Sequence, residues 1–260
     1  MKKTASLLFV VSTILCAADK TPQVTVGSGD RVISHIALGG GWTTTLTVVN
    51  LWSAPSPFQV AFYDDNGLPL SVNTNSAQGV TPVYRSTVAV RASQRILISG
   101  DSTVKSGWAE VSYDWATAVV GISAVFRQSI DGRPDFEAVS PVATPYSAIR
   151  VPFDETGGYS TGLAIANPAT SAETYRLTAR DEQGNTLNAA PITITLQSKG
   201  HTAFALVGNA DLKPFVQNQK GVIDIVAVGN KPMGVLGLRF SPTFSFTSTV
   251  PWYLTWGTYQ

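Results

Sequence analysis

The chain contains the same unit twice, and this repeat limits the folds that are open to it. The string GGWTTTLTVVN…FYDDNGLPL begins at Gly40, and the string GGYSTGLAIAN…TARDEQGNTL begins at Gly157. Identical residues recur at one constant offset of 117 positions: Gly40/Gly157, Gly41/Gly158, Leu46/Leu163, Asn50/Asn167, Asp64/Asp181, Gly67/Gly184 and Leu70/Leu187. We therefore expect two copies of one folding unit.

The composition allows two globular units and argues against a nucleic-acid partner. With 260 residues, of which 44% are hydrophobic, the chain is long enough to bury two cores. Only 13% of the residues are charged, against a usual value of about 25%. The net charge is +1 and there is no basic run, so the electrostatic footprint of a nucleic-acid-binding protein is missing.

The N-terminus has the pattern of an export signal. Lys2 and Lys3 precede a short apolar stretch at 5–16, and small residues follow at Ala17 and Ala18. We predict a signal peptide at 1–18, which implies a secreted, periplasmic or cell-surface protein. The apolar stretch is too short to span a membrane.

The single cysteine of the chain, Cys16, lies within this predicted signal. The processed chain would then have no cysteine, so packing and strand pairing alone would hold its fold. A lipoprotein signal is the less favoured alternative, because Leu15 stands where a small residue is needed.

Apolar and polar residues alternate along most of the chain, and this pattern predicts half-buried strands. Asn66-Gly67 is a strong hairpin signal between two such runs. Apart from a short helical turn at 209–215, no segment has a helical period. Roughly seven short strands in each unit predict two tandem immunoglobulin-like β-sandwiches, with a small barrel as the alternative.

The repeat and the distribution of proline and glycine give the expected domain boundaries. The stretch 129–147 contains Gly132, Pro134, Pro141 and Pro145, as is typical of a linker. The expected segments are a first domain at 19–128, a linker at 129–147, a second domain at 148–250 and an aromatic tail at 251–260.

The segment 158–162 reads GYSTG and matches the nucleophile elbow of serine hydrolases at Ser160. Asp181 and His201 follow in the order of a catalytic acid and histidine. However, the repeat places Thr43 at the position of Ser160, and Asp181 belongs to a predicted hairpin turn. A serine hydrolase is therefore kept only as a remote alternative, and no catalytic residue is predicted.

No metal or cofactor site is predicted. The two histidines, His35 and His201, lie in different units, and His201 is matched with Arg95, which favours an exposed strand position. The ligand spacing of a zinc site is missing. The turn at 64–66 contains acidic residues, so calcium binding there stays an open alternative to a purely structural turn.

One acidic position recurs in both units, where Glu110 is matched with Asp224. A single active site would need its acid in one copy only. We interpret these charges as structural ones, with salt bridges at the rim of a sheet.

Tryptophans are the candidate ligand-binding residues. Trp42, Trp52 and Trp115 lie in the first unit and have no tryptophan counterpart in the second. Packing in a core or between the units is the favoured interpretation for the tryptophans as a group, and the alternative is a set of exposed rings that stack on sugars or anchor a protein partner. Trp108, which is matched with Val222, is expected in the core instead.

The strings HIALGGGWTTTLTVVN, FYDDNGLPL, GWAEVS, AVFRQ and GRPDFEA resemble those of a group of exported proteins from Acidobacteria-type soil bacteria. The strings FDETGGYSTGLAIANP, RDEQGN, GHTAFAL and GVLGLRF extend the resemblance over roughly residues 33–250. The group is functionally uncharacterised, so the resemblance implies a secreted bacterial sandwich protein and no catalytic residues. The general pattern is also similar to immunoglobulin-like repeats of adhesins and of accessory modules of exported enzymes.

The sequence therefore favours a non-catalytic, exported structural or adhesive interaction module. Its expected partner is a protein or a polysaccharide at the cell surface. No nucleic-acid partner, no cofactor and no membrane span in the mature chain is expected. The alternative is a carbohydrate-binding module that uses the exposed tryptophans.

Overall fold

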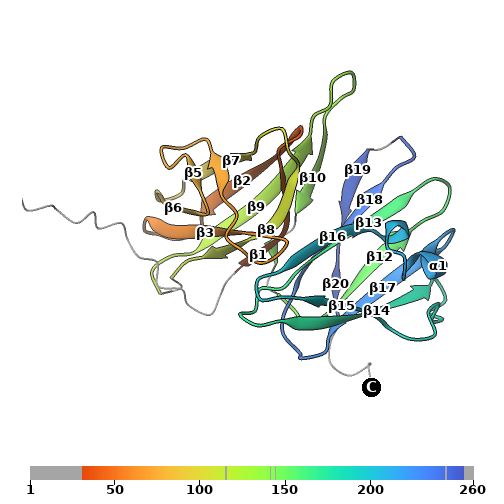
Figure 1. Cartoon of the computed structure of the whole chain (residues 1–260). Helices are drawn as coiled ribbons and strands as arrows, with labels where there is room; N and C mark the ends of the chain where they lie inside the picture. Colours follow the sequence, from red (N-terminus) through yellow and green to blue (C-terminus); the bar gives the residue numbers. More distant parts are fainter. Residues whose placement is uncertain (1–30, 115, 141, 144, 244, 255–260) are drawn as a thin grey trace, which may run out of the picture.

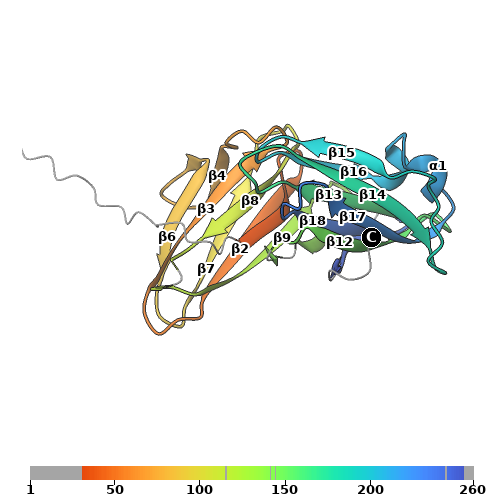
Figure 2. The ribbon, with the colours of Figure 1, turned by 90° about the horizontal axis from the view of Figure 1, so that it is seen from below.

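The computed structural model describes residues 31–254, except 115, 141, 144 and 244. The predicted signal peptide at 1–18, Trp115 and residues 255–260 lie outside the described residues. The described residues form four antiparallel sheets, two from the first half of the chain (31–143) and two from the second half (145–254). Figure 1 shows the halves side by side, and Figure 2 shows them from below.

The first half forms sheets 1 and 2, which share one hydrophobic core. Sheet 1 has the order β11-β1-β8-β3-β6, with β1 (Arg31–Leu38), β3 (Ser56–Asp64), β6 (Val83–Val88), β8 (Lys105–Ser112) and β11 (Val142–Ala143). Sheet 2 has the order β10-β9-β2-β7-β4-β5, with β2 (Trp42–Asn50), β4 (Val72–Thr74), β5 (Val80–Thr81), β7 (Ser93–Ser99), β9 (Val120–Gln128) and β10 (Phe136–Ser140).

The second half forms sheets 3 and 4 around a second core. Sheet 3 has the order β15-β14-β17-β12-β20, with β12 (Ala148–Asp154), β14 (Glu173–Asp181), β15 (Ile192–Leu196), β17 (Lys220–Ala227) and β20 (Trp252–Tyr253). Sheet 4 has the order β16-β13-β18-β19, with β13 (Ser160–Ala166), β16 (His201–Ala205), β18 (Gly234–Phe240) and β19 (Phe246–Thr249). The helical turns described are a 3-10 turn (Leu206–Gly208) and α1 (Lys213–Val216), close to the turn expected at 209–215.

The prediction of two immunoglobulin-like β-sandwiches is wrong. In an immunoglobulin domain the first strand pairs with the second in the same sheet. Here β1 pairs with β8 and β9 pairs with β2, and the second half repeats this with β12 on β17 and β18 on β13. The four sheets are instead arranged as a four-bladed β-propeller. Alternation locates strands but does not specify their neighbours, which is why the sequence leads to the wrong pairing.

The same local contacts shape both halves. Asp64 accepts backbone N–H groups from Asn66 and Leu68 at 2.9 and 2.8 Å, and Asp181 closes its turn in the same way. Gly67 and Gly184 follow with φ of 80° and 87°, a conformation that favours glycine. These contacts explain why the two strings match so closely around the turns.

Residues 129–147, expected as a linker, include β10 and β11, which join sheets 2 and 1. The equivalent strands at the other end of the chain are β19 and β20, which join sheets 4 and 3. The expected tail thus contributes Trp252 and Tyr253 to an edge strand beside β12. Within the described part of the chain, no helix has the length and apolar character to cross a bilayer.

The two halves meet along sheet 4, which contacts both sheets of the first half. Trp108 on β8 is fully buried there and stacks on Tyr63, with 4.9 Å between the ring centroids. Its Nε1–H donates to the carbonyl oxygen of Lys199 at 2.7 Å, and the Lys199 ammonium lies 2.9 Å from the carboxylate of Glu110. Trp108 is buried, as expected from the sequence, but the second half is what covers it.

Candidate functional site

The candidate site is an open groove on the outer face of sheet 3. Alternation along β12 turns Ile149, Val151 and Phe153 into the core and leaves Arg150 and Asp154 on the outer face. Side chains from β14 and β17 and from the turn after β14 complete the groove, which encloses about 1150 Å³. This volume lies above the range of about 300–1,000 Å³ that is usual for small-molecule sites.

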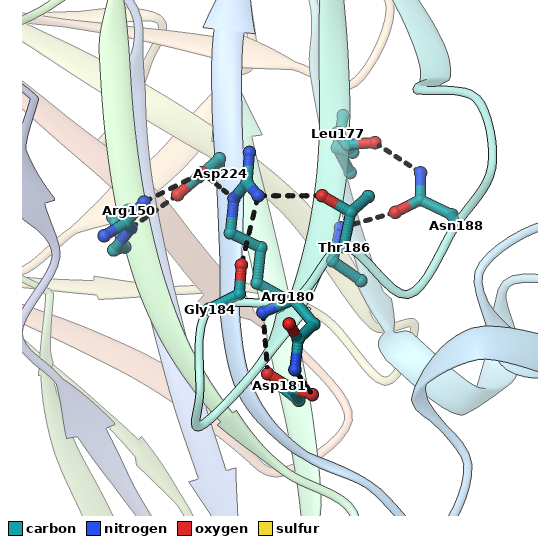
Figure 3. Close-up of polar contacts among 10 residues, drawn as sticks. Arg150, Leu177, Arg180, Asp181, Gly184, Thr186, Asn188 and Asp224 are labelled. Carbon is teal, nitrogen blue, oxygen red and sulfur yellow. Dashed lines mark hydrogen bonds and ion pairs between the residues drawn. The ribbon is translucent and has the colours of Figure 1, made fainter. Parts of the chain in front are cut away.

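Asp224, in the middle of β17, holds two arginines at the floor of the groove (Figure 3). Its side chain is only 3% exposed. Arg150 donates Nε–H and Nη2–H to the two carboxylate oxygens at 2.6 and 2.9 Å, and Arg180 donates Nε–H at 2.9 Å. A buried carboxylate is costly unless it is paired, and the two guanidinium groups provide that pairing.

Further contacts fix the orientation of Arg180. Its Nη1–H groups lie 2.8 Å from the Thr186 hydroxyl and 3.3 Å from the Gly184 carbonyl oxygen (Figure 3). The same figure shows Asn188, which accepts the backbone N–H of Ala179 and donates to the carbonyl oxygen of Leu177. The turn and the arginine therefore form one hydrogen-bonded unit, and the arginine pair is preorganised by these contacts.

The rim of the groove carries further charges. Arg239 donates to Asp154 at 2.7 Å and lies over the ring of Tyr159, 3.5 Å from its centroid. Burial alone would raise the pKa of Asp154, but the hydrogen bonds from Arg239 and Thr156 outweigh it and hold this pKa below its usual value. Lys220 pairs with Glu182 at 3.2 Å on the opposite rim. The surface is thus a mosaic of both charges rather than an anion site.

Strand pairing identifies the counterpart of this face in the first half. Asp224 lies opposite Thr178, and Glu110 lies opposite Ala61, the residue that the repeat matches with Thr178. Glu110 and its neighbour Trp108 are covered by the second half. The same face of the repeat is therefore closed in sheet 1 and open in sheet 3.

A second polar cluster connects the halves at their junction. His201 Nδ1 lies 2.7 Å from Asp65 Oδ1, and His201 Nε2 lies 3.3 Å from His35 Nδ1. Ser106 donates its hydroxyl to the same Asp65 carboxylate at 3.1 Å. Burial and the neighbouring charge of His201 lower the pKa of His35 to about 3.

The expectation of an exposed His201 is wrong, because this residue is only 2% exposed. His201 pairs with Ala166, whose counterpart Val49 pairs with Ser93, so strand pairing matches His201 with Ser93 and not with Arg95. An insertion between the copies shifts this part of the repeat. The His35–His201–Asp65 contact gives no local sequence signal, since its members are far apart in the chain.

The structure separates the tryptophans that the sequence selects. Trp42 lies between the halves, where its ring is 5.6 Å from Phe246 and 6.1 Å from Phe126. Trp52 is 40% exposed and follows the opposite end of β2, so roughly 27 Å of strand separates it from Trp42. Trp115 lies outside the described residues. The rings of Trp42 and Trp52 therefore do not form a shared binding platform.

The residues of the apparent hydrolase motif are not brought together. His201 pairs with Ala166, six residues along β13 from Ser160, which corresponds to roughly 20 Å. Asp181 is occupied by its turn, where hydrogen bonds, above all that from Asn185, lower its pKa. His201 is already bound to Asp65.

The arginine pair of the groove was missed by the sequence analysis, although a signal for it exists. Asp224 stands between isoleucines in the apolar run VIDIV, and a carboxylate in such a strand needs a cation nearby. No group of three or more metal-ligating side chains occurs among the described residues. Comparisons with models of protein families, with curated proteins and with solved structures found no match for this chain.

Proposed function

We propose that this protein is an exported, non-catalytic interaction module, and that the groove of sheet 3 binds a protein partner at the cell surface. One observation carries the proposal: the outer face that the repeat buries in sheet 1 is open in sheet 3 and holds a preorganised arginine pair. Export is inferred from the signal pattern at 1–18 and from the resemblance to exported bacterial proteins.

The first half illustrates how this face of the repeat is used. There it receives a polypeptide turn, and the contact combines a stacked tryptophan, a hydrogen bond to a backbone carbonyl and an ion pair with Lys199. A face that packs against a turn within the chain is suited to the same kind of contact with another protein. Arginine side chains are common at the centres of such interfaces, because they contribute both a flat surface and several donors.

The groove favours a protein over a polysaccharide. Sugar-binding surfaces present exposed aromatic rings for stacking. Among the described lining residues of the groove the one aromatic side chain is Phe153, and it is buried in the core. The charged mosaic instead offers complementary positions for a polypeptide of mixed charge. A carbohydrate site that uses Trp52 would be a separate surface.

Photo-crosslinking tests this function in the cells that make the protein. p-Benzoylphenylalanine replaces Thr178 in the groove, and in a matched control it replaces Leu97, which is 38% exposed on sheet 2. We expect a discrete protein adduct from position 178, absent from position 97 and lost when Arg180→Ala is added. The same set of crosslinked products from positions 178 and 97, or crosslinks to polysaccharide alone, would contradict the proposal.

A further inference from the structure

A small pocket lies between the halves, next to the Asp65–His201–His35 chain. It encloses about 300 Å³, at the lower end of the range for small-molecule sites. Its walls come from sheet 1, with His35 and Ser106, from sheet 2, with Trp42 and Phe126, and from sheet 4. The main residues of the sheet 4 wall are Leu163, Ala164, Leu236, Leu238 and Phe240.

The described lining carries few polar groups: the His35 imidazole, the Ser106 hydroxyl and the indole N–H of Trp42. The Ser106 hydroxyl is already donated to Asp65. A pocket that is apolar on almost all sides and has one imidazole in its wall fits the usual composition of a ligand site, in which a few polar groups set the orientation.

The contacts of His35 engage one of its two ring nitrogens, because Nδ1 lies 3.3 Å from His201 Nε2. Burial alone would raise the pKa of Asp65, but the hydrogen bonds from His201 and Ser106 hold it below its usual value, so the carboxylate is an ionised acceptor and His201 carries a proton on Nδ1. When both imidazoles are neutral, Nε2 of His201 accepts the proton of His35 Nδ1. His35 is left with a lone pair on Nε2, and no group among the described residues donates to it.

His35 thus offers an acceptor at the wall of an apolar, ring-lined pocket. His201, which contacts His35 Nδ1, does not line the pocket. The edge of the His35 imidazole that carries Nε2 is therefore the one available to a ligand in the pocket. We propose that this pocket binds a small aromatic molecule with one hydroxyl group, whose O–H donates to His35 Nε2 and whose ring packs between Trp42, Phe126 and Phe240. This inference does not depend on the function proposed for the groove.

Two probes of nearly the same shape test the acceptor. 2-Naphthol carries the donor, and 2-methylnaphthalene replaces its hydroxyl with a methyl group. In an apolar pocket without an acceptor, the hydrocarbon should bind roughly tenfold more tightly, because the hydroxyl must leave water unpaired. We expect 2-naphthol to bind at least as tightly as 2-methylnaphthalene, with Kd values measured by fluorescence titration of the full protein.

A tenfold preference for the hydrocarbon would overturn the role of His35. Absence of binding by both probes up to 1 mM would overturn the pocket itself.

Two tryptophan substitutions test whether 2-naphthol binds in this pocket. Ala203 lines the pocket but is exposed, so Ala203→Trp fills the pocket without disturbing a core. Thr193→Trp, at an exposed position of β15 outside the pocket, is the matched control. We expect Ala203→Trp to weaken 2-naphthol binding at least tenfold and the control to leave it unchanged. Equal affinity in both variants would show that the probe binds elsewhere, which contradicts the assignment.

Discussion

At the residue scale, Asp224 determines the shape of the groove because it neutralises and orients Arg150 and Arg180. Asp224→Ala leaves two partly buried guanidinium groups without their acceptor, and we expect a loss of about 2–3 kcal/mol in the free energy of unfolding. Glu182→Gln removes an exposed pair with Lys220 and should cost less than about 0.5 kcal/mol. Urea unfolding of the two variants measures the difference. Equal midpoints would contradict a structural role for Asp224.

The same residues separate stability from recognition. Replacing Arg150 and Arg180 with methionine together with Asp224→Leu substitutes an apolar cluster for the ion triad, and such replacements are often neutral in stability. We expect this triple variant to unfold near the wild-type midpoint and to lose the adduct formed from position 178. A triple variant that keeps the adduct would show that the arginine pair takes no part in binding.

At the element scale, two equivalent asparagines hold the turns at the ends of the halves. Asn167 Nδ2 donates to the carbonyl oxygens of Ser171 and Gln197 at 2.9 and 2.8 Å, and Asn50 makes the matching contacts in the first half. Either Asn→Ala variant leaves buried carbonyl groups unpaired and should cost about 2 kcal/mol. Only Asn167→Ala should also expose Trp108, because the turn after Gln197 covers this ring. Acrylamide quenching checks this, and equal quenching in both variants would contradict it.

The sequence predicts most of these elements but not their neighbours. Alternation and the Asx turns at Asp64 and Asp181 locate the strands and hairpins, since both depend on residues close together in the chain. The pairing of β1 with β8 joins residues that are far apart in the chain, so no local sequence pattern predicts it. For this reason the strand pattern led to the wrong architecture. His201 was misplaced for the same reason, because its burial is produced by Asp65 and His35 of the other half.

At the scale of the whole molecule, the junction makes stability depend on pH through His35. Its pKa is about 3 in the folded protein and near 6.5 in the unfolded chain. Between these values the unfolded chain binds a proton that the folded protein does not, so stability falls as the pH is lowered. The expected slope is about 1.4 kcal/mol per pH unit. His35→Gln should remove this contribution, and an identical slope in wild type and variant between pH 4 and 6 would refute it.

We propose that one face of the repeat, which the second half closes in sheet 1, is open to a partner in sheet 3. Cysteines at the equivalent positions Ala61 and Thr178, with Leu97→Cys as the exposed control, measure this directly when maleimide labelling is quantified by mass spectrometry. We predict that Thr178→Cys reacts in the purified protein but is protected in intact cells, that Ala61→Cys is protected in both, and that Leu97→Cys reacts in both. Equal labelling of Thr178→Cys in the purified protein and in cells would contradict the account.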